Sequence, residues 1–285
     1  MTIYFIITGF SDETRERAAL LEAACRQRGI VCTTMESTTA DRLALPTLRP
    51  GDALYNATRG GMRLEELLWR PGVATFYNAG QPPRGIQDTT RWLAPHARAE
   101  LPQPQTINHT TADKELLEHY AAHLGGFPLV VKVAGGSRGT GVMRVDSLPA
   151  LFSLTDYLAS SGAEFVLRQY INSDGVVRLF VVGSNVVGTL KNPNRHKDFR
   201  TNLGLENEFA LTSVSEEVQQ TAIQAVHAVG VELGGVDMII DRAGKHFLLE
   251  MNFPAGFAKF PSLGVDVPGR IVEHLAAKAA RLATQ

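Results

Sequence analysis

The stretch GVDMIIDRAGKHFLLEMN, residues 235–252, decides the fold class that the sequence predicts. Two apolar runs flank the polar residues 242–245, and this pattern is typical of two antiparallel strands joined by a tight turn. Asp237 interrupts the first run, and Glu250 and Asn252 lie at the end of the second. We therefore expect a β-hairpin that carries polar side chains inside an otherwise apolar sequence.

The polar side chains of this hairpin are expected to converge on one face. Side chains alternate between the two faces of a strand, so Glu250 and Asn252 share a face. If Asp241 pairs with His246, Asp237 lies beside Glu250 on the neighbouring strand. Buried carboxylates need a cation, and hard oxygen ligands favour magnesium, whereas a salt bridge to Lys or Arg would meet the same need. The hairpin alone leaves both partners open.

A glycine-rich loop follows another predicted strand in FPLVVKVAGGSRGTGV, residues 127–142. The strand places Lys132 directly before the loop, where its charge could face phosphate groups. Glycines let backbone N–H groups approach phosphate oxygens closely, although the spacing differs from that of a Walker-type P-loop. Taken alone, the segment fits a nucleotide flap and a plain hairpin turn equally well. The glycines of the loop are Gly135, Gly136, Gly139 and Gly141.

Basic residues interrupt two further segments, RQYINSDGVVRLFVVG at 168–183 and KNPNRHKDFRTNLG at 191–204. Arg178, Lys191 and Arg200 could line a sheet that faces a phosphate. A solvated polar face explains any one of them equally well, because charged side chains are mostly exposed.

The N-terminal part of the chain has the alternating pattern of a small open parallel sheet. A helix pattern opens at Ser11, the expected N-cap, and stops at Gly29, and no dinucleotide-binding glycine fingerprint follows the first strand. A Gly- and Pro-containing linker at 79–84 predicts a boundary near residue 82. The expected strands of this part are 3–8, 30–33, 53–55 and 73–77.

Beyond residue 127 the sequence changes to short strands mixed with helices, which is typical of an α+β arrangement. The expected strands are 129–133, 165–170, 177–182, 186–190, 237–240 and 247–251.

The composition excludes several classes of function. The net charge of −1 provides no general field that would attract nucleic acid or an anionic membrane. No apolar run reaches the length of a membrane span, and the two cysteines, Cys25 and Cys32, have no companion histidines at metal spacing. We therefore expect a cytoplasmic protein without nucleic-acid or membrane partners, and the sequence leaves a homo-oligomer open.

The order of these segments resembles that of the successive motifs in the RimK-like ATP-grasp ligases, over roughly residues 125–275. The resemblance continues past the hairpin through Pro254 and Gly256 into GVDVPGRIVEHL, residues 264–275. It implies an N-terminal pre-ATP-grasp domain at 1–82 and two α+β lobes at 83–168 and 169–285 that hold ATP between them. The motifs that carry it are Lys132 with its glycine loop, Arg178, FRTN (199–202), Asp237 and the run Glu250, Met251, Asn252.

The resemblance also implies a role for each motif residue. Arg178, Arg200 and Asn202 would face the transferring phosphate and the acyl group. Asp237, Glu250 and Asn252 would hold Mg²⁺, or Mn²⁺ in its place. The residues that would contact ATP are Lys132, Gly135, Gly136, Ser137, Arg138, Gly139, Gly141, Gln169, Tyr170, Ile171, Asp174 and Lys191.

Three positions depart from the family pattern. Relatives usually carry a lysine near the start of the central lobe, where this chain has Thr89 or Thr90, with Arg91 as a substitute. Gln169 stands where relatives have a glutamate before the hinge tyrosine. Val176 stands where they have an aspartate, although Asp174 lies close.

The chemistry implied is amide formation through an acyl phosphate, with a carboxylate and an amine as substrates and an amino acid such as glutamate as one of them. A kinase-like or regulatory ATP-binding protein and a plain small-ligand module are the alternatives. Asn56 and Arg59 in YNATRGG, residues 55–61, could bind a substrate carboxylate or belong to an ordinary loop. No nucleophilic side chain is required, so we expect His109, His196 and His246 to be structural or surface residues rather than catalytic ones.

Overall fold

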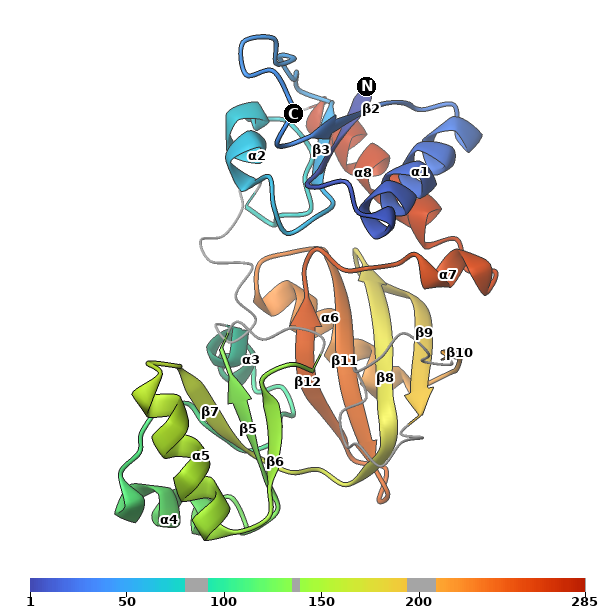
Figure 1. Cartoon of the computed structure of the whole chain (residues 1–285). Coiled ribbons are helices and arrows are strands. Elements are labelled where there is room, and N and C mark those ends of the chain that lie inside the picture. The colour runs from blue at the N-terminus through green and yellow to red at the C-terminus, as the bar shows by residue number, and fades with distance from the viewer. Residues whose placement is uncertain (80–91, 135–138, 194–208, 285) are drawn as a thin grey trace.

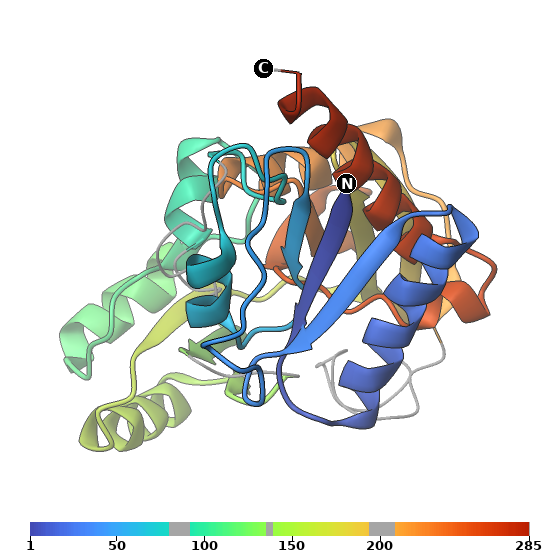
Figure 2. The same cartoon turned by 90° about the horizontal axis from the view of Figure 1, so that it is seen from above.

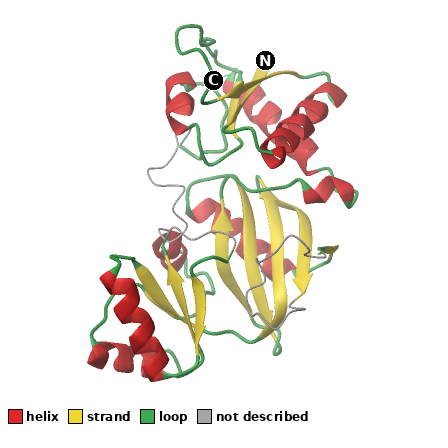
Figure 3. Cartoon of the chain, in the orientation of Figure 1, coloured by secondary structure: helices red, strands yellow, loops and turns green. Residues whose placement is uncertain are grey.

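The described residues form three separate β-sheets, and helices cover them (Figures 1 and 3). The structure is a computed structural model that describes residues 1–79, 92–134, 139–193 and 209–284. The mixed α/β and α+β content agrees with the class predicted from the sequence. The predicted boundary at residue 82 lies outside the described residues, and the division of the chain into 1–82, 83–168 and 169–285 stays a prediction.

The N-terminal sheet is parallel, as the sequence pattern predicts, with the strand order β2-β1-β3. Residues 73–77 do not form a fourth strand and make only isolated bridges, at Ala74 and Tyr77. The elements of this unit are β1 (Thr2–Ile7), α1 (Asp12–Gln27), β2 (Val31–Glu36), β3 (Ala53–Asn56) and α2 (Met62–Leu68).

Helix α1 begins and ends where its sequence indicates. The Ser11 side chain accepts a hydrogen bond from the Thr14 N–H, and Asp12 and Glu13 in the first turn favour the positive end of the helix dipole. Gly29 follows the helix with a φ of +64°, a conformation that glycine adopts without steric cost.

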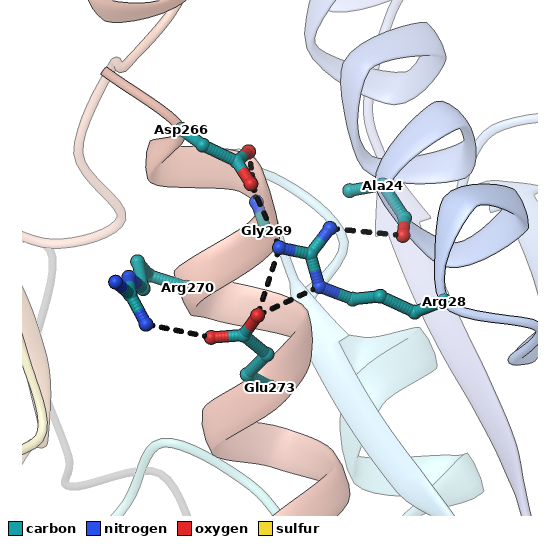
Figure 4. Close-up of polar contacts among 6 residues, drawn as sticks. All are labelled: Ala24, Arg28, Asp266, Gly269, Arg270 and Glu273. Carbon is teal, nitrogen blue, oxygen red and sulfur yellow. Dashed lines mark hydrogen bonds and ion pairs between the residues drawn. The ribbon is translucent and has the colours of Figure 1, made fainter.

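The helix α8 (Val267–Leu282), which follows the C-terminal sheet, returns to the N-terminal unit and packs against α1 and β3 (Figure 2). Arg28 at the end of α1 donates hydrogen bonds to Asp266 at 2.7 Å and to Glu273 at 2.8 Å (Figure 4). The guanidinium lies against Gly269, where any Cβ atom would overlap it. The two helices are therefore joined by close packing as well as by ion pairs.

The central sheet has the order β4-β7-β5-β6 with antiparallel neighbours. Its strand residues Leu129, Val131 and Leu167 are fully buried in a core shared with α4 and α5. The elements of this lobe are α3 (Leu93–Arg98), β4 (Thr106–Ile107), α4 (Lys114–His123), β5 (Leu129–Val133), β6 (Val142–Val145), α5 (Leu148–Ser160) and β7 (Phe165–Gln169).

The C-terminal sheet is antiparallel with the order β10-β9-β8-β11-β12, and α6 packs against it. Among the described residues, no helix is long and apolar enough to cross a membrane. The elements of this lobe are β8 (Ser173–Val182), β9 (Asn185–Pro193), β10 (Ala210–Leu211), α6 (Glu216–Ala228), β11 (Leu233–Asp241), β12 (His246–Asn252) and α7 (Lys259–Ser262).

The register of the β11–β12 hairpin differs by one residue from the assumed pairing. His246 pairs with Ile240 rather than with Asp241. A β-bulge next to Asp237 then takes up one residue of β12, so that Asp237 lies opposite Glu250. The predicted neighbours are thus correct, although the pairing from which we derived them is not.

Candidate active site

A row of charged side chains crosses three neighbouring strands of the C-terminal sheet. Asp237 on β11 lies opposite Arg178 on β8 and opposite Glu250 on β12. The Arg178 Nε and Nη2 atoms donate to the two oxygens of Asp237 at 2.7 and 2.6 Å. This buried carboxylate raises the pKa of the Arg178 guanidinium, so the arginine stays charged. A two-pronged pair of this kind fixes the orientation of both side chains.

A second ion pair joins the C-terminal sheet to the central sheet. Lys132 Nζ on β5 donates to Glu250 Oε2 on β12 at 2.7 Å. Burial raises the pKa of the Glu250 carboxyl, but Lys132, together with Asn252 and Arg178, more than offsets this effect, so the pKa lies below its ordinary value. The Lys132 side chain, which the sequence places before the glycine loop, therefore reaches the predicted metal ligand on the opposite lobe.

The third predicted metal ligand connects this site to the N-terminal unit. Arg59 Nη2 donates to Asn252 Oδ1 at 2.8 Å. Arg59 lies in the loop after β3, close to the carboxyl end of the parallel sheet. All three structural units thus contribute a cationic side chain to one group of oxygen ligands.

The donor set of Asp237, Glu250 and Asn252 fits a hard divalent cation. Two carboxylates on adjacent strands repel each other unless cations compensate them, and a bound Mg²⁺ would do so through oxygen ligands. In the structure, Lys132 and Arg178 provide this compensation, which is the salt-bridge alternative left open by the sequence. No cluster of three or more His, Cys, Asp or Glu side chains suited to a metal occurs in the described part of the chain, so Asn252 is needed to complete the set.

The described end of the glycine loop has the backbone geometry that requires glycine. Gly139 has a φ of +78° and Gly141 a φ of +81°. Gly141 accepts a hydrogen bond from the Val133 N–H, so the loop closes the β5–β6 hairpin beside Lys132. The remaining predicted loop residues, Gly135, Gly136, Ser137 and Arg138, lie outside the described residues.

The family-specific model of the RimK-like ATP-grasp domain matches residues 87–275, which include both sheets that carry this site. The chain belongs to the RimK-like ATP-grasp family. Its three-sheet arrangement, with Lys132 and Glu250 paired between two lobes, is accordingly an ATP-grasp fold.

Curated relatives of this RimK-like chain are described as ligases. A "Probable alpha-L-glutamate ligase" of Picosynechococcus sp. (strain ATCC 27264 / PCC 7002 / PR-6) is 30% identical over 207 residues, 71% of this chain and 67% of that protein. Another of the same description, from Xanthomonas euvesicatoria pv. vesicatoria (strain 85-10), is 34% identical over 155 residues, 53% of this chain and 52% of that protein. The match therefore spans about half the length of the Xanthomonas relatives.

Solved structures support the fold over nearly the whole chain. The ATP-grasp ligase PsnB complexed with a minimal precursor has a TM-score of 0.73 at 21% identity, covering 98% of this chain and 100% of that chain. The D-cycloserine synthetase DcsG has a TM-score of 0.73 at 17% identity, covering 99% and 100%. At these identities the likeness establishes the ATP-grasp fold alone.

Several predicted site residues of this RimK-like chain lie away from the row. Lys191 pairs with Val177, one step from the Arg178–Leu190 pair, so it faces the opposite side of the sheet from Arg178. Asp174 contacts Arg242 at 3.8 Å between two exposed side chains.

The three predicted hinge residues at the end of β7 have different surroundings. Gln169 pairs with Leu129, on the face of the central sheet away from Lys132, so a contact with the nucleotide would have to come from its backbone. Tyr170 lies next to Arg144, whose guanidinium carbon is 4.9 Å from the ring centroid. Ile171 follows directly and continues into β8. The positions Arg200, Asn202, Thr89, Thr90 and Arg91 lie outside the described residues.

Sequence reasoning missed Asn192 and Lys259, and it included Arg168 only as part of RQYI (168–171), the segment that by the family resemblance would border the adenine. Arg168 is 6% exposed and follows the apolar strand residues 165–167, and Asn192 is 5% exposed and pairs with Val176. Lys259 in α7 is close enough to the site that its pKa is lowered, first by burial and then by the charge of Arg178. A charged residue inside a predicted strand, as in VLRQY (166–170), was the available signal for Arg168.

The structure describes two of the three histidines for which we expect structural or surface positions. His246 shares a 3.0 Å hydrogen bond with Thr221 on α6, and His109 packs edge-on against Tyr120. His196 lies outside the described residues.

Proposed function

We propose that this chain is an ATP-dependent, ADP-forming carboxylate–amine ligase that uses Mg²⁺, with Mn²⁺ as an alternative metal. The observation that carries the proposal is the paired arrangement of Lys132 with Glu250 and Arg178 with Asp237 at the junction of the two lobes. Acids that could bind a metal and cations that could bind phosphate lie together in this arrangement, and phosphoryl transfer requires both.

The charge of the site suits a polyanionic substrate. Its cationic side chains outnumber Asp237 and Glu250, and within the described part of the chain neither Arg168 nor Lys259 forms an ion pair with a carboxylate. A triphosphate would neutralise this surplus. Mg²⁺ would in turn take over the compensation of Asp237 and Glu250, so that Lys132 and Arg178 become available to phosphate oxygens.

The proposed reaction has two steps. A carboxylate oxygen of the first substrate attacks the terminal phosphorus of ATP, which forms an acyl phosphate and releases ADP. The amine of the second substrate then attacks the acyl carbon, loses a proton and displaces inorganic phosphate. When bound, Mg²⁺ neutralises the phosphate charge that develops during transfer. Lys132 and Arg178 orient the phosphate groups, so positioning and electrostatics account for the catalysis.

The loop after β3 is the candidate site for a substrate carboxylate. The chain passes from β1 outward to β2 and then returns to place β3 on the other side of β1, so the strand order reverses between β1 and β3. Ligands of open parallel sheets bind at such a reversal, at the carboxyl ends of the strands. Thr58 in this loop has a buried hydroxyl that finds no hydrogen-bond partner in the described part of the chain, and Arg59 contacts Asn252. We propose that this loop binds an anionic substrate next to the phosphate site, and that glutamate, which appears in the relatives' names, is the first amino acid to test.

The test is a phosphate-release screen of amino acids and small carboxylates with ATP and Mg²⁺, with the ligated product identified by mass. We expect ADP and phosphate in equal amounts and an amide that requires both a carboxylate and an amine. Hydroxylamine added with the carboxylate should trap an acyl hydroxamate. AMP as the stoichiometric product would refute the mechanism, and ADP with a stable phosphorylated substrate would identify a kinase-like protein instead.

A further inference from the structure

Arg168 is a buried arginine with one nitrogen unused. It is 6% exposed, its Nε donates to Thr106 Oγ1 at 3.0 Å, and its Nη1 donates to the Leu249 carbonyl at 2.9 Å. Its Nη2 is buried and has no hydrogen-bond partner among the residues that the structure describes. A guanidinium nitrogen left unpaired in a dry site is costly, so such an atom calls for an explanation.

The unused nitrogen lies between the two lobes. Thr106 belongs to β4 of the central lobe, whereas Leu249 belongs to β12 of the C-terminal lobe, next to Glu250. In the central sheet, Arg168 pairs with Val130 and Lys132 pairs with Val166. Because directly opposite residues and alternate residues share a face, Arg168 and Lys132 point to the same side of this sheet.

The position of Arg168 along the strands identifies which part of a nucleotide it would meet. The glycine loop follows Lys132 at one end of β5, and the phosphates belong at that end. Arg168 lies level with Val130, about 7 Å further from the loop at two residues of strand spacing. It also directly precedes the hinge that begins at Gln169. The base of a nucleotide whose phosphates lie under the loop would therefore extend toward Arg168.

The guanidinium restricts the chemistry of its partner, because all its nitrogens are donors and none can accept a hydrogen bond. On a purine, N7 is an acceptor that this group can use, whereas the exocyclic amino group of adenine is a donor that it cannot. We propose that Arg168 recognises the purine base of the bound nucleotide by donating a hydrogen bond from Nη2 to N7. This proposal rests on the ATP-dependent function proposed above.

The test is a cycle of binding measurements with ATP and with 7-deaza-ATP, in which a C–H group replaces N7 without changing the shape of the base. Wild-type protein should bind 7-deaza-ATP on the order of tenfold more weakly than ATP, since a hydrogen bond to a charged donor is lost. Arg168→Met and Arg168→Lys should bind both nucleotides with nearly equal affinity. Thr106→Val removes one anchor of the guanidinium but leaves Nη2, and it should keep the discrimination.

A merely structural role of Arg168 would lower the affinity for both nucleotides by the same factor in the variants. Equal affinity of the wild-type protein for ATP and 7-deaza-ATP would refute the proposal even if no Arg168 variant folds. If the loss of affinity in Arg168→Lys differs among ATP, ADP and AMP, the residue binds phosphate rather than the base, and this result would also overturn the proposal. A protein that binds no purine nucleotide would refute both this proposal and the proposed function.

Discussion

Glu65 gives the protein a pH-dependent stability that can be predicted in sign and size. Its carboxyl group is 1% exposed on α2, and it accepts a hydrogen bond from Asn56 Nδ2 at 3.1 Å. Burial raises the pKa of Glu65 to about 7 from an ordinary value of 4.5, although the hydrogen bonds from Asn56 and Tyr77 oppose the shift. The folded state therefore binds more protons than the unfolded state between these two values.

The sign and size of the effect follow from this difference in proton binding. The free energy of unfolding falls as pH rises through the interval from about 4.5 to about 7, because deprotonation places a charge in a buried site. Each pKa unit is worth about 1.4 kcal/mol, so the whole interval corresponds to about 3 kcal/mol. Glu65→Gln keeps an oxygen that can accept the hydrogen bond from Asn56, but it cannot ionise. Its free energy of unfolding should therefore lack this decrease with pH.

The assay is urea unfolding from pH 4.5 to 8, followed by tryptophan fluorescence, since Trp69 directly follows α2. Glu16→Gln, at an exposed position of α1 in the same unit, is the control and should retain the wild-type slope. Other titrating groups affect all three proteins alike, so the comparison isolates Glu65. Equal slopes in wild type and Glu65→Gln would show that the buried carboxyl is not protonated preferentially in the folded state.

Three further substitutions test the site and the packing. Glu250→Gln should reduce turnover by more than about a hundredfold while the protein still folds, because a metal ligand loses its charge; exposed Glu217→Gln is the control, and unchanged Mg²⁺-dependent activity would remove Glu250 from the metal site. Lys132→Met should weaken ATP binding or slow turnover on the order of a hundredfold in a phosphate-release assay, and normal kinetics would leave the lysine a structural role only. Gly269→Ala should lower the free energy of unfolding by about 1–3 kcal/mol, since its Cβ would overlap the Arg28 guanidinium, and unchanged urea unfolding would mean that the helices separate easily.

The sequence predicted the parts of the fold that depend on local patterns. The turn at 242–245 and the polar interruptions at Asp237 and Glu250 were sufficient to expect a hairpin with two acids side by side. The bulge that brings them opposite each other was not predictable, because one extra residue in a strand cannot be recognised from the alternation of its side chains. Local pattern thus predicted that the two acids are neighbours, whereas the register came from the structure alone.

The residues that sequence reasoning missed depend on long-range contacts. Arg168 was part of a recognised segment, but its burial results from packing of β7 against β12, which lies far along the chain. The salt bridges of Lys132 and Arg178 likewise connect strands that are distant in sequence, and the sequence alone could not decide between them and a metal ion as partners of the acids. Lys191 was expected in the site because it is basic, and only the register showed which face it occupies.

The return of α8 to the N-terminal sheet has a consequence for synthesis on the ribosome. Strand β3 ends at Asn56, whereas the helix that covers it begins at Val267, after both ATP-grasp lobes. Until α8 emerges, apolar residues of the N-terminal unit that pack against it remain open to other contacts, and exposed apolar surface of this kind promotes aggregation of nascent chains. The N-terminal unit is synthesised first, but it completes its packing last.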